Sequence, residues 1–226
     1  MAHQLGLNLP SRTALGRDAF FVAPSNAMAM AMIDGWRGWA GGKLALTGPQ
    51  GSGKTHLTHV WADLSGAQII SATDLQDADI PALARGPVAV EDVHLIANDD
   101  DAQTALFHLH NLVRAEGQAL LLTGTGGVAH WGLTLPDLVS RMRGATAVEM
   151  DAPDDALLSA LLVKLLADRQ LTPKPELINY LMTRMDRSFA AAIALVDRLD
   201  AASLTQKPPL TRALVAQVLD IAPPQA

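Results

Sequence analysis

A glycine-rich segment that ends in lysine and threonine carries the strongest chemical signal in the sequence. The segment follows an apolar run, Leu44–Thr47, and has the form G-x-x-x-x-G-K-T from Gly48 to Thr55. Glycines let backbone N–H groups turn inward around phosphate oxygens, and the N-terminus of a following helix adds its dipole. Lys54 would reach the outer phosphates, and the Thr55 hydroxyl is placed to coordinate Mg²⁺. The segment therefore predicts a nucleotide phosphate site.

Two acidic residues would complete such a site. Glu91 and Asp92 follow the apolar run Val88–Val90, which we expect to form a strand neighbouring the one before the glycines. One carboxylate would hold the Mg²⁺ shell and the other would polarise the attacking water, and the sequence does not divide these roles. Glu91 and Thr55 are the expected metal ligands. The alternative is that both acids belong to an ordinary loop.

The elements that must position these residues alternate along the middle of the chain. Helical patterns, notably 55–64 and 102–116, separate short β-type runs, an order that predicts an α/β fold with a parallel sheet covered on both faces. The expected strands are Leu44–Thr47, Gln68–Ile70, Val88–Glu91, Leu120–Thr123 and Ala145–Met150.

After Met150 the strand signals stop. Asp151-Ala-Pro-Asp-Asp155 is a helix-start signal, and a leucine stripe between 157 and 166 follows it. Further helices are expected at 175–185, 188–204 and 210–219. We therefore expect a tail at 1–12, an α/β domain at 13–150 and a small helical domain at 151–226.

Composition excludes several classes of protein. Hydrophobic residues make up 49% of the 226 residues, enough for a sizeable core, and no apolar run approaches the roughly 18 residues that span a bilayer. The net charge is −6 with no clustered basic face, so strong direct binding to nucleic acid is not expected. Without cysteine or a secretory signal, we expect a cytoplasmic protein.

Beyond the phosphate segment, several motifs carry a family resemblance. The chain resembles the AAA+ ATPases of the DnaA group, and within that group the DnaA-related regulatory proteins. The resembling segments are Phe21–Asn26, Gly48–His56, Leu106–Asn111, Leu135–Met142 and Met185–Phe189.

This resemblance implies a P-loop AAA+ three-layer sandwich with a parallel five-stranded sheet, followed by an all-helical lid. It also implies ADP or ATP with Mg²⁺ as the cofactor. The residues that match the family's nucleotide site are Phe21, Val22, Pro24, Asn26, Gly48, Pro49, Gln50, Gly51, Ser52, Gly53, Lys54, Thr55 and His56.

Arg141 matches the family's arginine finger. In that role it would project from one subunit toward the γ-phosphate held by a neighbour, where a guanidinium stabilises the charge of the transition state. The alternative is a surface arginine in a helix salt bridge.

Three positions depart from the family pattern. Thr125 follows Leu122-Thr123-Gly124 where the family usually has a polar or acidic sensor residue, so the acid is missing there. Ala190 stands where the arginine of the second sensor would be, and Glu91 stands where the metal-side residue is usually aspartate. Thr125 or Thr123 could still hydrogen-bond a water or a phosphate, and Arg187 could approach from another angle. The chain is thus better equipped to hold a nucleotide than to hydrolyse it.

Two functions follow from these residues. The first is a regulator that docks on the DNA polymerase III β sliding clamp and uses Arg141 to provoke ATP hydrolysis by DnaA, with self-association possible. The second is a stand-alone DnaA-like ATPase, acting as an initiator or helicase loader. The acidic balance, the departures at 125 and 190, and the lack of room after the lid for a DNA-binding domain favour the first. A small-molecule kinase lacks a recognisable acceptor site.

The N-terminal segment bears on this choice. Gln4, Leu5, Leu7 and Leu9 form a Gln-Leu-x-Leu-x-Leu pattern ahead of Pro10, which resembles the peptide that many proteins insert into the sliding clamp. A terminal position makes such a segment reachable. The alternative is a short edge strand against the α/β core.

Overall fold

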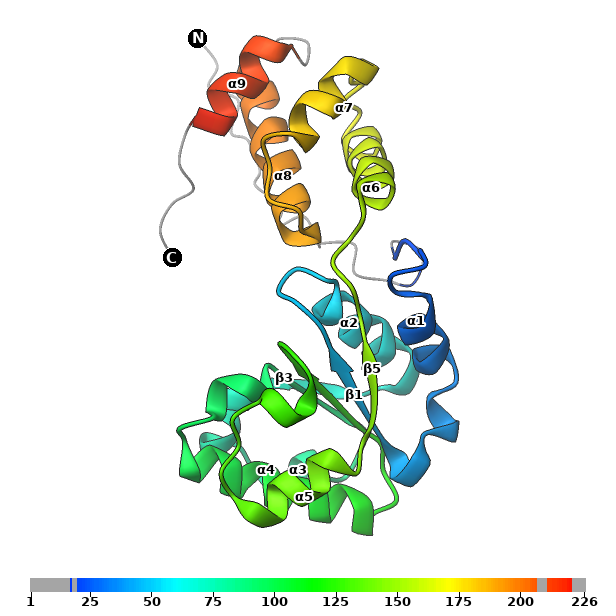
Figure 1. Ribbon diagram of the computed structural model, residues 1–226, viewed down its shortest axis with the longest axis vertical. Helices are drawn as coiled ribbons and strands as arrows, with labels where there is room; N and C mark the ends of the chain where they lie inside the picture. Colours follow the sequence, from blue (N-terminus) through cyan, green and yellow to red (C-terminus); the bar gives the residue numbers. More distant parts are fainter. Residues whose placement is uncertain (1–16, 18–19, 207–210, 221–226) are drawn as a thin grey trace, which may run out of the picture.

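The computed structural model describes residues 17, 20–206 and 211–220 of the chain. Within them lies one parallel sheet of five strands in the order β2-β3-β4-β1-β5 (Figure 1). This confirms the predicted α/β class and the five expected strand positions. The strands are β1 Lys43–Thr47, β2 Gln68–Ser71, β3 Val88–Glu91, β4 Leu120–Gly124 and β5 Thr146–Glu149.

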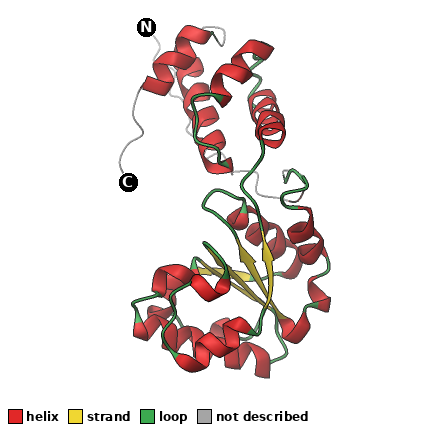
Figure 2. Ribbon diagram, in the orientation of Figure 1, coloured by secondary structure: helices red, strands yellow, loops and turns green. Residues whose placement is uncertain are grey.

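Helices cover both faces of the sheet, which makes the α/β part a three-layer sandwich (Figure 2). On one face α1 (Ala27–Asp34) and α2 (Lys54–Ser65) pack over Leu44, Leu46 and Leu121. On the other face α3 (Ile80–Leu83), α4 (Asp100–Ala115) and α5 (Pro136–Arg143) pack over Val88, Val90 and Leu122. Short 3₁₀ turns complete the connections at Trp36–Gly38, Ala40–Gly42, Ala72–Asp77 (η4), Val93–Ile96 (η5) and Val128–His130.

Local sequence explains where the main helices begin and end. The Asp99 side chain accepts a hydrogen bond from the backbone N–H of Ala102 at 2.9 Å and so caps the N-terminus of α4. Gly66, in the left-handed conformation at φ 74°, ends α2. The eight-residue helices α1 and α5 were not among the helices predicted from the sequence.

Beyond β5 the chain forms a second, helical unit with its own core. It contains α6 (Asp155–Asp168), α7 (Pro175–Met182), α8 (Phe189–Gln206) and α9 (Arg212–Asp220), and its core includes Leu158, Leu162, Leu195 and Val215. Asp154 caps α6 through the N–H of Leu157 at 2.7 Å, as the helix-start signal predicted. The helix α7 ends three residues before the expected Met185. This unit is the predicted helical lid.

None of the helices in the described ranges combines the length and the apolar character that crossing a membrane requires.

Candidate nucleotide site and the arginine helix

The order of the strands decides which residues meet at the candidate site. We expected β3, with its acids, to lie beside β1, but β4 lies between them. Because neighbouring strands are spaced by roughly 4.8 Å, the acids stand about two strand spacings from β1. All strands are parallel, so their carboxyl ends still meet at one edge of the sheet. The intervening strand places Thr123 at this edge, between the phosphate loop and the acids.

The loop after β1 takes a course that its glycines permit. Gly48 has φ 145°, and a Cβ there would lie 2.3 Å from the backbone oxygen of Met150. Gly51 has φ 75°, and a Cβ there would lie 2.3 Å from the Cβ of Ser188 in the lid. Both positions combine a left-handed backbone with a close approach, so a side chain would force the loop open. The loop is therefore held between the end of the sheet and the lid.

Lys54 points back into this loop. Its Nζ donates hydrogen bonds to the carbonyl oxygens of Gly48, at 2.9 Å, and Pro49, at 2.8 Å. Burial lowers the pKa of Lys54 from its ordinary value, and the negative charges of Asp92 and Glu91 act in the opposite direction. The ammonium group is thus held near both acids, in the middle of the candidate site.

Two buried oxygen atoms near the loop have no hydrogen-bond partner among the described residues. They are Oγ of Ser52 and Oε1 of Glu91. An unpaired buried polar atom is costly, and each of these is suited to a ligand: a hydroxyl donates to a phosphate oxygen, and a carboxylate accepts a water of a Mg²⁺ shell. The residues present therefore fit a magnesium nucleotide, whose phosphates would supply most of the metal's ligands. The Thr55 side chain is exposed at the start of α2.

Asp92 is held in place by the neighbouring strand. It has a left-handed backbone, with φ 57°, and its N–H donates to Oγ1 of Thr123 at 3.1 Å. Thr125 is exposed, and its N–H donates to Nδ1 of His94 at 3.2 Å. Thr123 on β4, and not Thr125 beyond its end, is therefore the threonine whose side chain bonds to the backbone of Asp92.

The segment before α1 lies beside both the phosphate loop and the lid linker. The buried side chain of Asn26 shapes it, accepting from the N–H of Ala23 and donating to the carbonyl of Phe21, both at 2.8 Å. Phe21, Val22 and Pro24 remain exposed.

Two contacts tie this segment to its surroundings. Phe20 packs edge-on against the imidazole of His56, with ring centroids 5.1 Å apart, and the N–H of Asp151 donates to the carbonyl of Ser25 at 3.2 Å. These contacts place the segment 20–26 beside α2 and the linker to the lid, and the role of its residues in binding a nucleotide stays a prediction.

The lid meets the phosphate loop directly. The N–H of Phe189 donates to the carbonyl of Gly51 at 3.1 Å, and the Phe189 ring lies against Gly53. Ala190 is exposed, and Arg187 is paired with Asp155 at 2.5 Å. In this structure the guanidinium of Arg187 therefore interacts within the lid.

Arg141 is not brought to this site. It lies in the last turn of α5, which leads into the start of β5, and its carbonyl oxygen accepts a hydrogen bond of 2.7 Å from Nζ of Lys43 at the start of β1. The amino and carboxyl ends of these parallel strands are separated by the length of β1, roughly 13 Å. Figure 1 shows α5 at the end of the α/β domain away from the lid. The Arg141 side chain is exposed and belongs to none of the ion pairs in the described residues.

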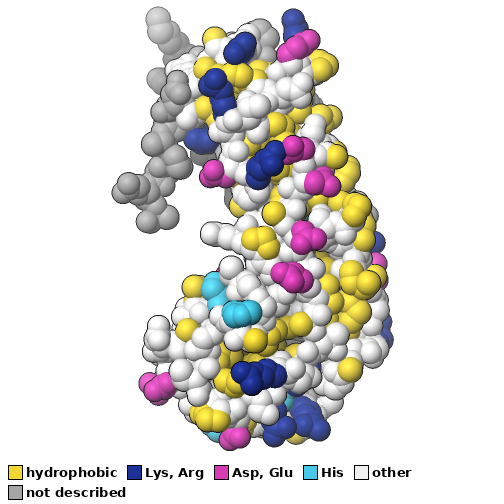
Figure 3. All heavy atoms as spheres, in the orientation of Figure 1, with side chains coloured by type: hydrophobic (Ala, Val, Ile, Leu, Met, Phe, Trp, Pro, Cys, Tyr) yellow, Lys and Arg dark blue, Asp and Glu magenta, His cyan; other side chains and the backbone are white. Residues whose placement is uncertain are grey.

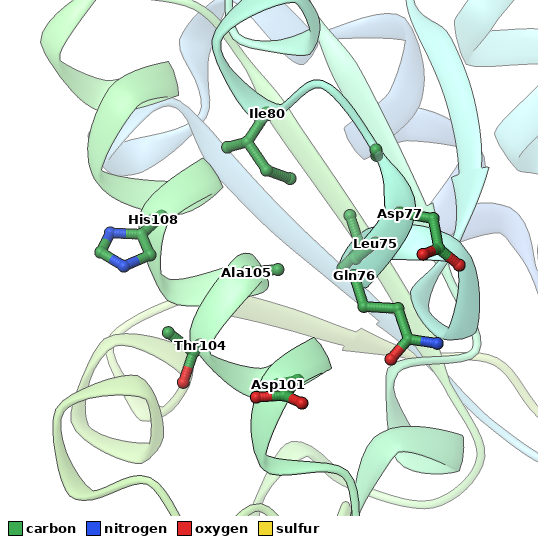
Figure 4. Close-up of a pocket in the computed structure, with 9 residues that line it drawn as sticks. Leu75, Gln76, Asp77, Ile80, Asp101, Thr104, Ala105 and His108 are labelled. Atoms are coloured by element: carbon green, nitrogen blue, oxygen red, sulfur yellow. The ribbon is translucent and has the colours of Figure 1, made fainter.

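A separate depression lies between η4, α3 and α4. It encloses about 430 Å³, and its lining includes Asp77, Asp101, Gln76 and His108 (Figure 4). Two carboxylates line it and no lysine or arginine does. It therefore does not fit a phosphate group, and the candidate site stays at the glycine loop.

Two contacts at these places were not predicted from the sequence. The role of Lys43 as a partner of α5 depends on a residue 98 positions away, and nothing near Lys43 in the chain signals it. The approach of Ser188 to Gly51 likewise joins distant segments. The predicted residues Gln4, Leu5, Leu7 and Leu9 lie outside the described residues.

Comparisons with known proteins agree with this arrangement. Residues 154–219 match the family model of the Hda lid domain. An uncharacterized protein of Haemophilus influenzae is 28% identical over 188 residues, which is 77% of this chain and 80% of that protein.

Among solved structures, domain III of DnaA from Thermotoga maritima superposes with a TM-score of 0.76 at 16% identity, covering 94% of this chain and 98% of that one. DnaA from Aquifex aeolicus, in a structure with bound AMPPCP, superposes with a TM-score of 0.69 at 20% identity, covering 88% and 68%. At these identities the superpositions establish the fold. The chain therefore has the fold of DnaA domain III, with a five-stranded parallel α/β core, and its helical lid is similar to the Hda lid domain.

Proposed function

We propose that this chain is a nucleotide-binding AAA+ regulator of replication initiation, which docks on the sliding clamp and stimulates ATP hydrolysis by DnaA through Arg141. The observation that carries the proposal is the position of Arg141. Its side chain is exposed, and α5 ends at the opposite edge of the sheet from the chain's own phosphate loop. A guanidinium placed there cannot act on a nucleotide in its own site, but it can act on one held by a neighbour.

The chemistry required of Arg141 is electrostatic. Hydrolysis of ATP places negative charge on the oxygens of the transferred phosphoryl group, and a guanidinium aimed at them stabilises the transition state. Since Arg141 has no carboxylate partner among the described residues, it would lose no ion pair on reaching the neighbour's phosphates. The Hda-type lid supports DnaA as that neighbour.

The chain's own site fits ADP or ATP with Mg²⁺. Lys54 would exchange its two loop carbonyls for phosphate oxygens, and Ser52 and Glu91 would gain the partners they lack. Bound nucleotide would bridge the phosphate loop and the lid, and so set the angle between them. With alanine at position 190 and Arg187 paired to Asp155, we propose that hydrolysis in this site is weak.

The N-terminal Gln4, Leu5, Leu7 and Leu9 are the proposed clamp-binding peptide, which would hold the protein in the cytoplasm at replicating DNA, where DnaA is met. Support comes from the sequence pattern alone.

The deciding experiment measures ATP hydrolysis by DnaA with and without DNA-loaded clamp. The parent protein should stimulate hydrolysis only with the loaded clamp, and Arg141→Ala should reduce the stimulated rate by at least about 100-fold. Arg143→Ala is the matched control, since residues two apart on a helix point in different directions. Fast hydrolysis by the isolated protein, unaffected by DnaA, would instead favour the stand-alone ATPase.

A further inference from the structure

The helix that carries Arg141 is short and is held at both ends by side chains from other elements. At its N-terminal end, Oε1 of the buried Gln103 in α4 accepts from the N–H groups of Thr134, at 2.8 Å, and Leu135, at 3.1 Å. The same side chain donates from Nε2 to the carbonyl oxygen of Ile96 at 3.0 Å. The start of α5 is therefore anchored to α4.

At the C-terminal end the carbonyl groups of the last turn need partners from outside the helix. The carbonyls of Ser140 and Met142 accept backbone N–H groups from Gly144 and Ala145, at 3.3 Å and 3.0 Å. The carbonyl of Arg141 accepts Nζ of Lys43 at 2.7 Å. A cation at a helix C-terminus also interacts favourably with the helix dipole. Lys43 thus holds the backbone of Arg141, the residue whose guanidinium is proposed to act on the partner.

Lys43 is itself held on its other side. Nε2 of the buried His110 lies 3.4 Å from Nζ of Lys43. An ammonium group only donates, so Nε2 must be the acceptor, and the proton of the neutral ring lies on Nδ1, 3.4 Å from Oδ1 of Asn111. Burial, and then the Lys43 charge, lower the pKa of His110, which agrees with a neutral imidazole.

The charges around Lys43 are of one sign. Burial lowers the pKa of Lys43, followed by the positive charges of Arg141 and Arg114. None of these three residues forms an ion pair with a carboxylate within the described ranges. Figure 3 shows lysine and arginine side chains at the end of the molecule where Figure 1 places α5, as well as over the lid. Repulsion between these like charges would turn the Arg141 guanidinium outward to solvent, and a bound polyphosphate would relieve the repulsion.

We propose that Lys43 is a positioning residue for Arg141: it fixes the end of α5 through the Arg141 carbonyl and keeps the guanidinium turned outward, ready for the phosphates of a nucleotide on a partner. The inference rests on the proposed function. Because Lys43 acts through Arg141, it contributes to the rate of hydrolysis and not to docking on the partner.

The test titrates DnaA and loaded clamp with the parent protein and with Lys43→Met, which keeps the length of the side chain but has neither donor nor charge. Misplacing a catalytic group by about 1 Å can cost about 100-fold, so we expect the maximal stimulated rate to fall about tenfold or more. The protein concentration that gives half of this rate should stay within about twofold of the parent's. Lys43→Arg, which keeps donor and charge, should recover most of the rate.

Lys174→Met removes an exposed lysine of the lid and should behave as the parent does. Thermal unfolding of each variant checks that it folds; if Lys43→Met does not, Lys43→Leu, which also has neither donor nor charge, replaces it with the same expectation. A parent-like maximal rate for the Lys43 variant, beside an inactive Arg141→Ala, overturns the inference alone. A change only in the half-saturating concentration also overturns it. If Arg141→Ala stimulates as well as the parent, the proposed function fails and the inference fails with it.

Discussion

At the scale of single residues, Lys54 shows what nucleotide binding must replace. Its ammonium group donates to the carbonyls of Gly48 and Pro49 and lies near Glu91 and Asp92. A phosphate that enters the loop exchanges two neutral acceptors for charged ones, and hydrogen bonds to charged groups are the stronger kind. The gain is available because the lysine is already desolvated and aimed into the loop.

Replacing Lys54 with methionine should therefore weaken the binding of ADP or ATP by about 100-fold, since a charged hydrogen bond contributes about 1.5–3 kcal/mol. Calorimetric titration with each nucleotide measures this loss. Lys174→Met, in the lid, is the control for removing one positive charge. Equal affinity of the Lys54 variant and the control would show that the glycine loop does not bind phosphate.

His110 should make the stability of the protein depend on pH. Its pKa is lowered in the folded state, so between that value and the unfolded value of 6.5 the unfolded chain binds more protons. The free energy of unfolding should fall as the pH is lowered through this window, by at most about 1.4 kcal/mol per pH unit for one site.

The variant His110→Gln, which keeps an acceptor for Lys43, should flatten this dependence in chemical denaturation measured between pH 7.5 and about pH 5. Other groups titrate in the same range, so the relevant quantity is the difference between parent and variant. Parallel curves for the two proteins would contradict the assignment.

At the scale of elements, the phosphate loop and the lid form one contact. The N–H of Phe189 at the start of α8 donates to the carbonyl of Gly51, and Ser188 fills the space where a Cβ on Gly51 would lie. We therefore expect a nucleotide that moves the loop also to move α8.

Gly51→Ala tests this coupling, and Gly66→Ala is its matched control. The two glycines have φ 75° and φ 74°, but a Cβ on Gly66 meets nothing within 4 Å. Gly66→Ala should lower the free energy of unfolding by about 1–2 kcal/mol, the backbone strain alone. Gly51→Ala adds a clash with Ser188, and we expect it also to weaken nucleotide binding by about tenfold or more. Identical nucleotide affinities in the two variants would rule out a contact that matters for binding.

At the scale of the whole molecule, the α/β domain presents different chemistry at the two edges of its sheet. The carboxyl edge, beside the lid, carries the phosphate loop and the acids, and the amino edge carries Arg141 and Lys43 (Figure 1). This separation suits an assembly in which one molecule holds a nucleotide and the next contributes the arginine.

The N-terminal peptide should act on the assembly without affecting either edge. Gln4→Ala combined with Leu7→Ala should abolish binding to immobilised clamp and the clamp-dependent stimulation of DnaA, because the peptide loses its polar rim contact and an apolar anchor. Nucleotide affinity should not change. If the double variant still bound the clamp, the alternative that these leucines form a short edge strand against the α/β core would be favoured.

The sequence by itself determined the class of fold and the place of the glycine loop between β1 and α2. Both depend on patterns within short segments of the chain. The loop is marked by glycines at fixed spacing between a strand and a helix, and the fold class by apolar runs of strand length separated by helical periods. The five strands and the leucine stripe of α6 therefore lie where the pattern predicted them.

Only the tertiary structure decided which distant residues meet. It inserted β4 between β1 and β3, which brought Thr123 and not Thr125 to the acids, and it paired Arg187 with Asp155. It also placed Lys43 against the carbonyl of Arg141, 98 residues away, at the edge of the sheet opposite the phosphate loop. Such contacts depend on strand order and on the packing of short helices, which a local pattern does not encode, because the partners share no segment of the chain.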